Sequence, residues 1–192
     1  MNDERVGSAG NEAMGSMARI LSPLERGGQA ELLYRRWPAE APRAAVIFVH
    51  GLGGHSDRYQ ECGRFWAGRG VSTYALELRG FGHHPEPRGH VDSFDIYHRD
   101  LEKLFARVAA ENSRRPVFLV GESMGGVIAV DFLLRRPALF SGLVLLAPAF
   151  QEVARGLFHD RVRGGLERLV RPRDRVLLPV HVRHQERQVV VD

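Results

Sequence analysis

The chain has few of the features that secreted or membrane proteins depend on. Cys62 is the one cysteine, which excludes an internal disulfide and is typical of a reducing compartment. No apolar run is long enough to span a bilayer. The N-terminal stretch MNDERVGSAGNEAMGSMA is polar and lacks the apolar segment of a secretory signal. These absences predict a cytoplasmic protein.

Blocks of like charge are absent as well. The 27 basic and 23 acidic residues give a formal net charge of +4, and they are interspersed along the chain. Lys103 is the one lysine, so arginine supplies nearly all of the positive charge. Without a basic block, the sequence gives no support for a nucleic-acid partner.

Segments with strand and helix patterns alternate along the chain. The predicted strands are 31–37, 44–50, 71–78, 116–121 and 141–148, and the predicted helices are 56–69, 95–110 and 123–135. The run AAVIFVH at 44–50 is continuously apolar, as in a strand buried on both faces. This alternation predicts an α/β fold with a mostly parallel sheet and helices on both faces.

Two of the predicted helices have apolar residues at helical spacing. These residues are Tyr59, Cys62, Phe65 and Trp66 in the first helix, and Leu101, Leu104, Phe105 and Val108 in the second. We expect both sets to face the core, with Cys62 acting as a small hydrophobic side chain.

The length of 192 residues suits a single domain. Residues 1–18 offer little to bury and are expected to be flexible. We assign 19–152 to the α/β core and 153–192 to the start of a cap or to irregular chain. Segment 153–171 has an apolar stripe and many arginines, which favours a cap helix first, packing on the core second, and a membrane-surface helix last. The final VLLPVHVRHQERQVVVD predicts one or two short strands or irregular chain.

The stretch VGESMGG contains the motif G-x-S-x-G between a predicted strand and a predicted helix. This motif holds a serine at a sharp strand-to-helix corner, where its hydroxyl is exposed to substrate. Ser123 is therefore the candidate nucleophile. The alternative is that Ser123 only caps the following helix.

The stretch HGLGG follows the buried strand at 44–50. In hydrolases with a corner serine, one oxyanion donor comes from the residue after the serine and one from a loop like this. The backbone amides of Met124 and Leu52 are therefore the candidate oxyanion hole. We expect the adjacent His50, Gly51 and Gly53 to contact substrate.

Four stretches together resemble the α/β-hydrolase fold: FVHGLGGHSDRY, LELRGFGHHPEPRGHVDSFDIYHRDL, PVFLVGESMGG and LVLLAPAF. Within that fold they resemble the monoacylglycerol lipase and lysophospholipase group, also called serine aminopeptidase S33-like hydrolases, over residues 35–150. The resemblance implies that Ser123 attacks a single fatty-acyl ester and forms an acyl-enzyme, with Leu52 and Met124 as oxyanion donors. It implies a small acyl-ester or lipid substrate and no metal or organic cofactor.

The acid and histidine of the catalytic triad are not identified by any motif. In this fold they follow the serine in chain order. The formal candidates are Glu152, Asp160, Asp174 and Asp192 as acids and His159, His181 and His184 as bases. The resemblance places further strands after the cap, so we expect a truncated or altered chain, incomplete at its C-terminal end. Without a base, little or no activity is expected, and the open sheet edge favours poor solubility or dimerisation.

The histidines before Ser123 are interpreted as parts of their loops rather than as catalytic or metal-binding groups. His83, His84, Glu86 and His90 lie in one loop, but their spacing matches no standard metal site, so no metal is expected. The resemblance accounts for His90 through RGHVDSF. His50 and His55 are interpreted as residues that shape their loop rather than as the base.

Two classes of function remain open. One is a serine hydrolase of monoacylglycerols, lysophospholipid-like esters or short-chain carboxylic esters, with possible peripheral contact to membranes. The other is a non-catalytic fragment or pseudoenzyme. The sequence leaves the oligomeric state undetermined.

Overall fold

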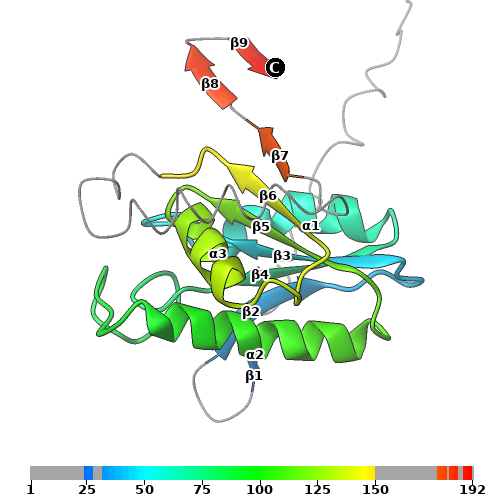
Figure 1. Ribbon diagram of the computed structural model, residues 1–192, viewed down its shortest axis with the longest axis horizontal. Helices are drawn as coiled ribbons and strands as arrows, with labels where there is room; N and C mark the ends of the chain where they lie inside the picture. Colours follow the sequence, from blue (N-terminus) through cyan, green and yellow to red (C-terminus); the bar gives the residue numbers. More distant parts are fainter. Residues whose placement is uncertain (1–23, 28–31, 150–176, 181, 186–187, 192) are drawn as a thin grey trace, which may run out of the picture.

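The structure is a computed structural model that describes residues 24–27, 32–149, 177–180, 182–185 and 188–191. Within these residues, seven strands form one sheet in the order β1-β2-β4-β3-β5-β6-β7, and β8 and β9 form a separate pair (Figure 1). The strands of the large sheet are β1 (Leu24–Gly27), β2 (Leu32–Trp37), β3 (Ala44–Val49), β4 (Val71–Leu76), β5 (Val117–Glu122), β6 (Gly142–Leu146) and β7 (Leu177–Val180).

Five strands of the sheet run parallel to one another. β3 is central and pairs in parallel with β4 and β5, so that Ile47 lies opposite both Tyr74 and Leu119. β6 and β7 continue the parallel part, while β2 is antiparallel to both β1 and β4. The loops that follow β3, β4, β5 and β6 therefore meet at one edge of the sheet, where α/β proteins place their sites.

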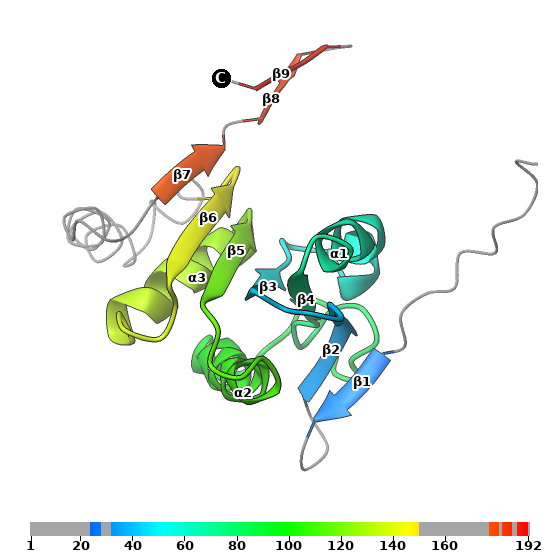
Figure 2. The ribbon, with the colours of Figure 1, turned by 90° about the vertical axis from the view of Figure 1, so that its right-hand side faces the viewer.

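Helices cover both faces of the sheet, as predicted. α2 (Asp95–Glu111) and α3 (Met124–Arg135) lie on one face, and α1 (Gln60–Ala67) lies on the other (Figure 2). Alternate side chains of a strand point to opposite faces, so β3 contributes Ile47 and Val49 to the core under α2 and α3 and Phe48 to the smaller core under α1. The predicted apolar stripe of α2 is buried in the larger core, with Phe105 at its margin.

The first predicted helix differs from its prediction. Residues Ser56–Tyr59 form a 3-10 turn (η1), and α1 begins only at Gln60. Phe65 and Trp66, expected in the core, are 51% and 40% exposed. The helix instead places Gly63 against the sheet, where an added Cβ would lie 2.2 Å from the ring of Trp37. Because Gly63 and half-buried Cys62 take the inner side, the two aromatic residues point outward.

The ends of the described chain add strands that the sequence pattern did not identify clearly. β1 was not predicted, and it pairs antiparallel with β2 from Leu24 opposite Arg35. β7 lies in the segment 153–192, which was assigned to a cap or to irregular chain, and it pairs in parallel with β6. β8 (Val182–Gln185) and β9 (Gln188–Val191) pair with each other. The domain boundaries at 18 and 152 remain predictions, and segment 153–171 lies outside the described residues.

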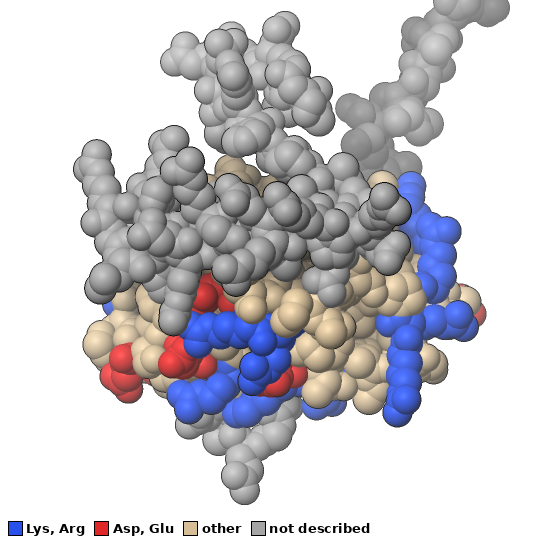
Figure 3. Space-filling model, viewed as in Figure 1, with Lys and Arg blue, Asp and Glu red and all other residues tan. Residues whose placement is uncertain are grey.

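Charges of both signs are mixed on the face that carries α2. Arg107 pairs with Glu111 at 2.8 Å, and Arg136 pairs with Glu102 at 3.3 Å. Figure 3 shows basic and acidic side chains together over the lower half of this view. Exposed pairs of this kind contribute about 1 kcal/mol or less. In the part of the chain that the structure describes, none of the helices combines the length and apolar character needed to cross a membrane.

Candidate active site

Ser123 lies at a sharp corner between β5 and α3. Its backbone has φ 51° and ψ −116°, which is a strained conformation for a residue with a side chain. Its amide donates to the Leu146 carbonyl at 3.0 Å, and its own carbonyl accepts from Ala149 at 3.1 Å, so the end of β6 supports the corner. Its side chain makes no capping hydrogen bond to α3, which contradicts the alternative of a simple helix cap.

The glycines around Ser123 allow three backbone segments to come together. A Cβ added at Gly121 would lie 2.6 Å from the Gly125 carbonyl oxygen, and one at Gly125 would lie 2.1 Å from the Val49 carbonyl oxygen. A Cβ at Gly126 would lie 2.9 Å from the Cβ of Pro148. Real Cβ atoms do not approach other atoms this closely, so these positions require glycine for the segments to pack together.

The loop of residues 50–55, which we call the oxyanion loop, lies against Ser123. A Cβ added at Gly51 would be 2.9 Å from the Cβ of Ser123 and 3.5 Å from its Oγ. Leu52 is 72% exposed, and Gly53 has a positive φ of 70°. Sequence positions more than 70 apart are thus brought into contact at the edge of the sheet.

The amides of Leu52 and Met124 are the predicted oxyanion donors. Neither donates to a backbone carbonyl in the turns and loops of the described residues. Met124 is the first residue of α3, so its N–H has no partner within the helix. The helix also directs the positive end of its dipole toward this point.

His50 is fully buried behind the oxyanion loop. Its Nε2 accepts a hydrogen bond from the Leu78 amide at 3.0 Å, so its proton is on Nδ1, which donates to the Gly51 carbonyl at 2.8 Å. The same carbonyl accepts from the Gly54 amide at 3.0 Å. Since both ring nitrogens bind backbone groups, the His50 side chain is engaged in shaping the loop, and its predicted contact with substrate remains untested.

The His50 ring should titrate at a lower pH than an ordinary histidine. Burial lowers its pKa from the ordinary value of 6.5, and the Gly51 carbonyl and Glu77 oppose this only in part. Burial also lowers the pKa of His98, against the opposing effect of Asp131. The unfolded chain therefore binds protons more readily than the folded chain, and stability should fall as the pH decreases from 6.5 through the folded pKa.

An NMR titration of the ring protons, with urea unfolding from about pH 8 to about pH 5, measures both effects. A free histidine peptide serves as the reference. A His50 midpoint at or above that of the peptide contradicts the burial argument.

Glu122, which precedes the serine, belongs to a polar group on the α1 face. It accepts hydrogen bonds from the Tyr59 hydroxyl at 2.9 Å and from Arg58 at 3.2 Å. Burial, and then Glu122, raise the pKa of Tyr59 well above its ordinary value. No local sequence pattern marks this group, because its members are more than 60 positions apart.

The three histidines at positions 83, 84 and 90 each lie beside a different carboxylate. His84 Nδ1 lies 3.2 Å from Glu86, His83 Nε2 lies 3.5 Å from Asp57, and His90 pairs with Asp92 at 3.2 Å. Within the described residues, no three His, Cys, Asp or Glu side chains are placed to hold a metal ion. His55 lies 3.8 Å from Asp57 and remains a residue of the loop.

The candidate partners of Ser123 in the triad fall outside what is described. The acids Glu152, Asp160, Asp174 and Asp192 and the bases His159 and His181 lie outside the described residues, and of His184 only the backbone, in β8, is described. No hydrogen bond joins Ser123 Oγ to a histidine among the side chains that are described.

A known family and several known proteins match a large part of this chain. The family described as serine aminopeptidase, S33, matches residues 40–188. Human monoglyceride lipase is 36% identical over 118 residues, which are 61% of this chain and 39% of that protein. The monoacylglycerol lipase of Mycolicibacterium smegmatis is 31% identical over 123 residues, which are 64% of this chain and 44% of that protein.

The fold is also similar to that of a solved lipase structure. The monoacylglycerol lipase of Paleococcus ferrophilus superposes with a TM-score of 0.55 at 26% identity, over 67% of this chain and 52% of that chain. The chain spans about two fifths of the length of the curated relatives it matches.

Proposed function

The chain belongs to the serine aminopeptidase S33 family of α/β hydrolases, and on this premise we propose that it carries the nucleophile and oxyanion hole of a serine hydrolase for carboxylic esters of fatty acids. The observation that carries the proposal is the contact between Gly51 and Ser123. It brings a strained serine, whose hydroxyl makes no capping hydrogen bond, against the loop that carries the Leu52 amide.

The chemistry follows from this arrangement. Ser123 Oγ attacks the ester carbonyl carbon, its proton passes to a base, and a tetrahedral oxyanion forms. The amides of Met124 and Leu52 donate to that oxyanion, and each such donor contributes about 2.7–4 kcal/mol to the transition state. The bond to the leaving alcohol then breaks as the alcohol takes the proton, which leaves an acyl-enzyme. Water attacks the acyl-enzyme, releases the fatty acid and restores Ser123.

The candidates for the base in this scheme are His159, His181 and His184, whose side chains are not described. If none of them reaches Ser123, the oxyanion hole and substrate binding alone support about 10³–10⁴-fold acceleration over water. Because no histidine among the described side chains is bonded to Ser123 Oγ, a non-catalytic acyl-binding role is the second candidate.

The substrate class is proposed from the relatives. Two of them are named as lipases of monoacylglycerols, and a third, from Bacillus subtilis, is named as a phospholipase. A monoacylglycerol or a lysophospholipid-like monoester is therefore the proposed substrate. Despite the name of the family, no residue of this chain argues for cleavage of peptides.

Chain-length preference tests the substrate class. We expect slow hydrolysis of 1-monooleoylglycerol and of the 4-nitrophenyl esters of octanoate and palmitate, with the acetate and butyrate esters slower still. An aminopeptidase substrate, leucine 4-nitroanilide, is the control and should not react. Faster turnover of acetate than of octanoate would indicate a short-chain carboxylesterase, and no hydrolysis of any ester would favour the non-catalytic role.

A further inference from the structure

Glu77 is a buried carboxylate at the carboxyl end of β4, close to the oxyanion loop. It is 1% exposed. Its Oε2 accepts a hydrogen bond from the Ser56 amide at 2.7 Å, and its Oε1 accepts one from the His83 amide at 2.7 Å. Burial by itself raises the pKa of Glu77, but hydrogen bonds from Ser56 and His83 outweigh it and hold the pKa below its ordinary value of 4.5. The group is therefore ionised at neutral pH.

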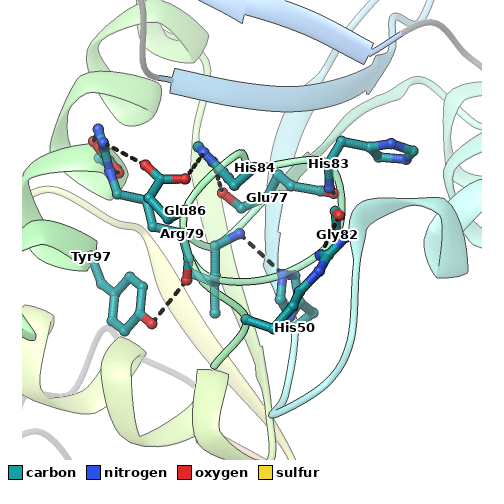
Figure 4. Close-up of polar contacts among 11 residues, drawn as sticks. His50, Glu77, Arg79, Gly82, His83, His84, Glu86 and Tyr97 are labelled. Carbon is teal, nitrogen blue, oxygen red and sulfur yellow. Dashed lines mark hydrogen bonds and ion pairs between the residues drawn. The ribbon is translucent and has the colours of Figure 1, made fainter. Parts of the chain in front are cut away.

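The two hydrogen bonds join separate segments of the chain. Ser56 directly follows the oxyanion loop, whereas His83 lies in the loop of residues 79–90, which we call the histidine loop. Figure 4 shows Glu77 beside Gly82 and His83, with His50 below them. Each oxygen of the carboxylate accepts a hydrogen bond from one of the two loops. An ionised carboxylate offers an acceptor to both amides at once.

Gly82 is shaped to fit this carboxylate. It has a positive φ of 55°, and a Cβ added there would lie 1.6 Å from Glu77 Oε1. Any side chain at position 82 would displace the carboxylate from the His83 amide. The histidine loop is thus built around Glu77.

A second link holds the other end of the oxyanion loop. The Leu78 amide donates to His50 Nε2, and His50 Nδ1 donates to the Gly51 carbonyl. The consecutive residues Glu77 and Leu78 therefore fix both ends of the loop, at Ser56 and at His50. Between these ends lies Leu52, and beside it Gly51 contacts Ser123.

We infer that Glu77 is a positioning residue: its carboxylate fixes the oxyanion loop and thereby sets the place of the Leu52 amide relative to Ser123 Oγ. The inference rests on the proposed function. The distance between an oxyanion and its donor must be kept within a few tenths of an ångström for full stabilisation, and a loop rich in glycine does not keep such a distance unaided.

The variant Glu77→Gln tests this inference. Glutamine has nearly the same volume but one acceptor oxygen, so one of the two amides must face an NH₂ group. The matched control is Asp100→Asn. Asp100 is also a buried carboxylate that anchors the histidine loop, through Arg79 at 2.7 Å, and its hydrogen bonds to Arg79 do not involve the oxyanion loop. The variant Glu77→Asp keeps both oxygens and should recover part of the loss.

Two measurements on the full chain compare the effects of these substitutions. The first is amide hydrogen exchange of residues 50–56, which should rise by about tenfold or more in Glu77→Gln and not in Asp100→Asn, as expected for one hydrogen bond to a charged group. The second is the limiting rate of covalent reaction with a fluorophosphonate. It should fall by about tenfold or more, with little change in the concentration that gives half the limiting rate.

Equal exchange of residues 50–56 in the two variants, after correction for the fraction unfolded, overturns the inference. An unchanged limiting rate in Glu77→Gln overturns it as well. If the wild-type chain does not react with the fluorophosphonate, the proposed function fails, and hydrogen exchange alone still decides whether Glu77 positions the loop.

Discussion

Replacing Ser123 with alanine is expected to abolish covalent reaction of the chain with a fluorophosphonate. The reagent bonds to a serine oxygen held beside oxyanion donors, and alanine has no such oxygen. The wild-type chain should take up one equivalent slowly, because no histidine among the described side chains is bonded to Ser123 Oγ. Intact-mass measurement gives the stoichiometry, and peptide mapping gives the modified residue.

The chain offers a matched control for this change. Ser113 also has a φ of 51°, and it is exposed. Ser113→Ala therefore makes the same chemical change at the same φ, and it should leave the reaction unaltered. Neither change should shift the free energy of unfolding by more than about 0.5 kcal/mol. Label that persists in Ser123→Ala would rule out the nucleophile, and rapid labelling of the wild type would show that a base is in place.

The largest loss of stability is expected from Gly125→Ala. The added Cβ would lie 2.1 Å from the Val49 carbonyl oxygen and 2.6 Å from that of His50. Both contacts are with backbone at the end of the central strand β3, which cannot move without breaking its pairing with β4 and β5. We expect a loss of about 3 kcal/mol or more, at the upper end of overpacking effects. That is a large share of the about 5–15 kcal/mol that stabilises a domain.

Urea unfolding followed by circular dichroism measures this loss, and Gly68→Ala is its control. Gly68 has an ordinary φ of −63°, and a Cβ there would meet only the Arg64 and Phe65 carbonyl oxygens, at 3.5 and 3.8 Å. Alanine at position 68 should therefore leave the unfolding midpoint near that of the wild type. A Gly125→Ala chain as stable as Gly68→Ala would mean that the corner is looser than its contacts indicate.

Local sequence patterns were informative at two places in the fold. The apolar run at 44–50 was predicted as a strand buried on both faces, and it forms β3 at the centre of the sheet. The G-x-S-x-G motif predicted a strained corner, and Ser123 has one. Both are local signals, because a strand flanked by turns and a glycine-bounded serine can be recognised within a few residues.

Where the local sequence pattern did not predict the structure, contacts with residues distant in the sequence determined it. Spacing placed Phe65 and Trp66 in the core, but contact between Gly63 and Trp37 turned them outward. β1 has no apolar alternation of its own, and it is a strand because β2 offers a free edge to pair with. In the sequence, Glu77 is an ordinary polar residue at the end of a strand. The fold brings the amides of Ser56 and His83 within hydrogen-bonding distance of it.

Local sequence patterns were enough to predict an α/β fold, the corner at Ser123 and the loop that faces it, because glycine-rich turns and buried parallel strands have strong local requirements. The α/β-hydrolase class came from the resemblance of four stretches to that family. The way in which the loop that faces Ser123 is held follows from the folded arrangement of the strands. The hydrogen bonds of His50 and Glu77 join residues more than 20 positions apart, and the partner of a buried polar group is set by which strands become neighbours in the sheet.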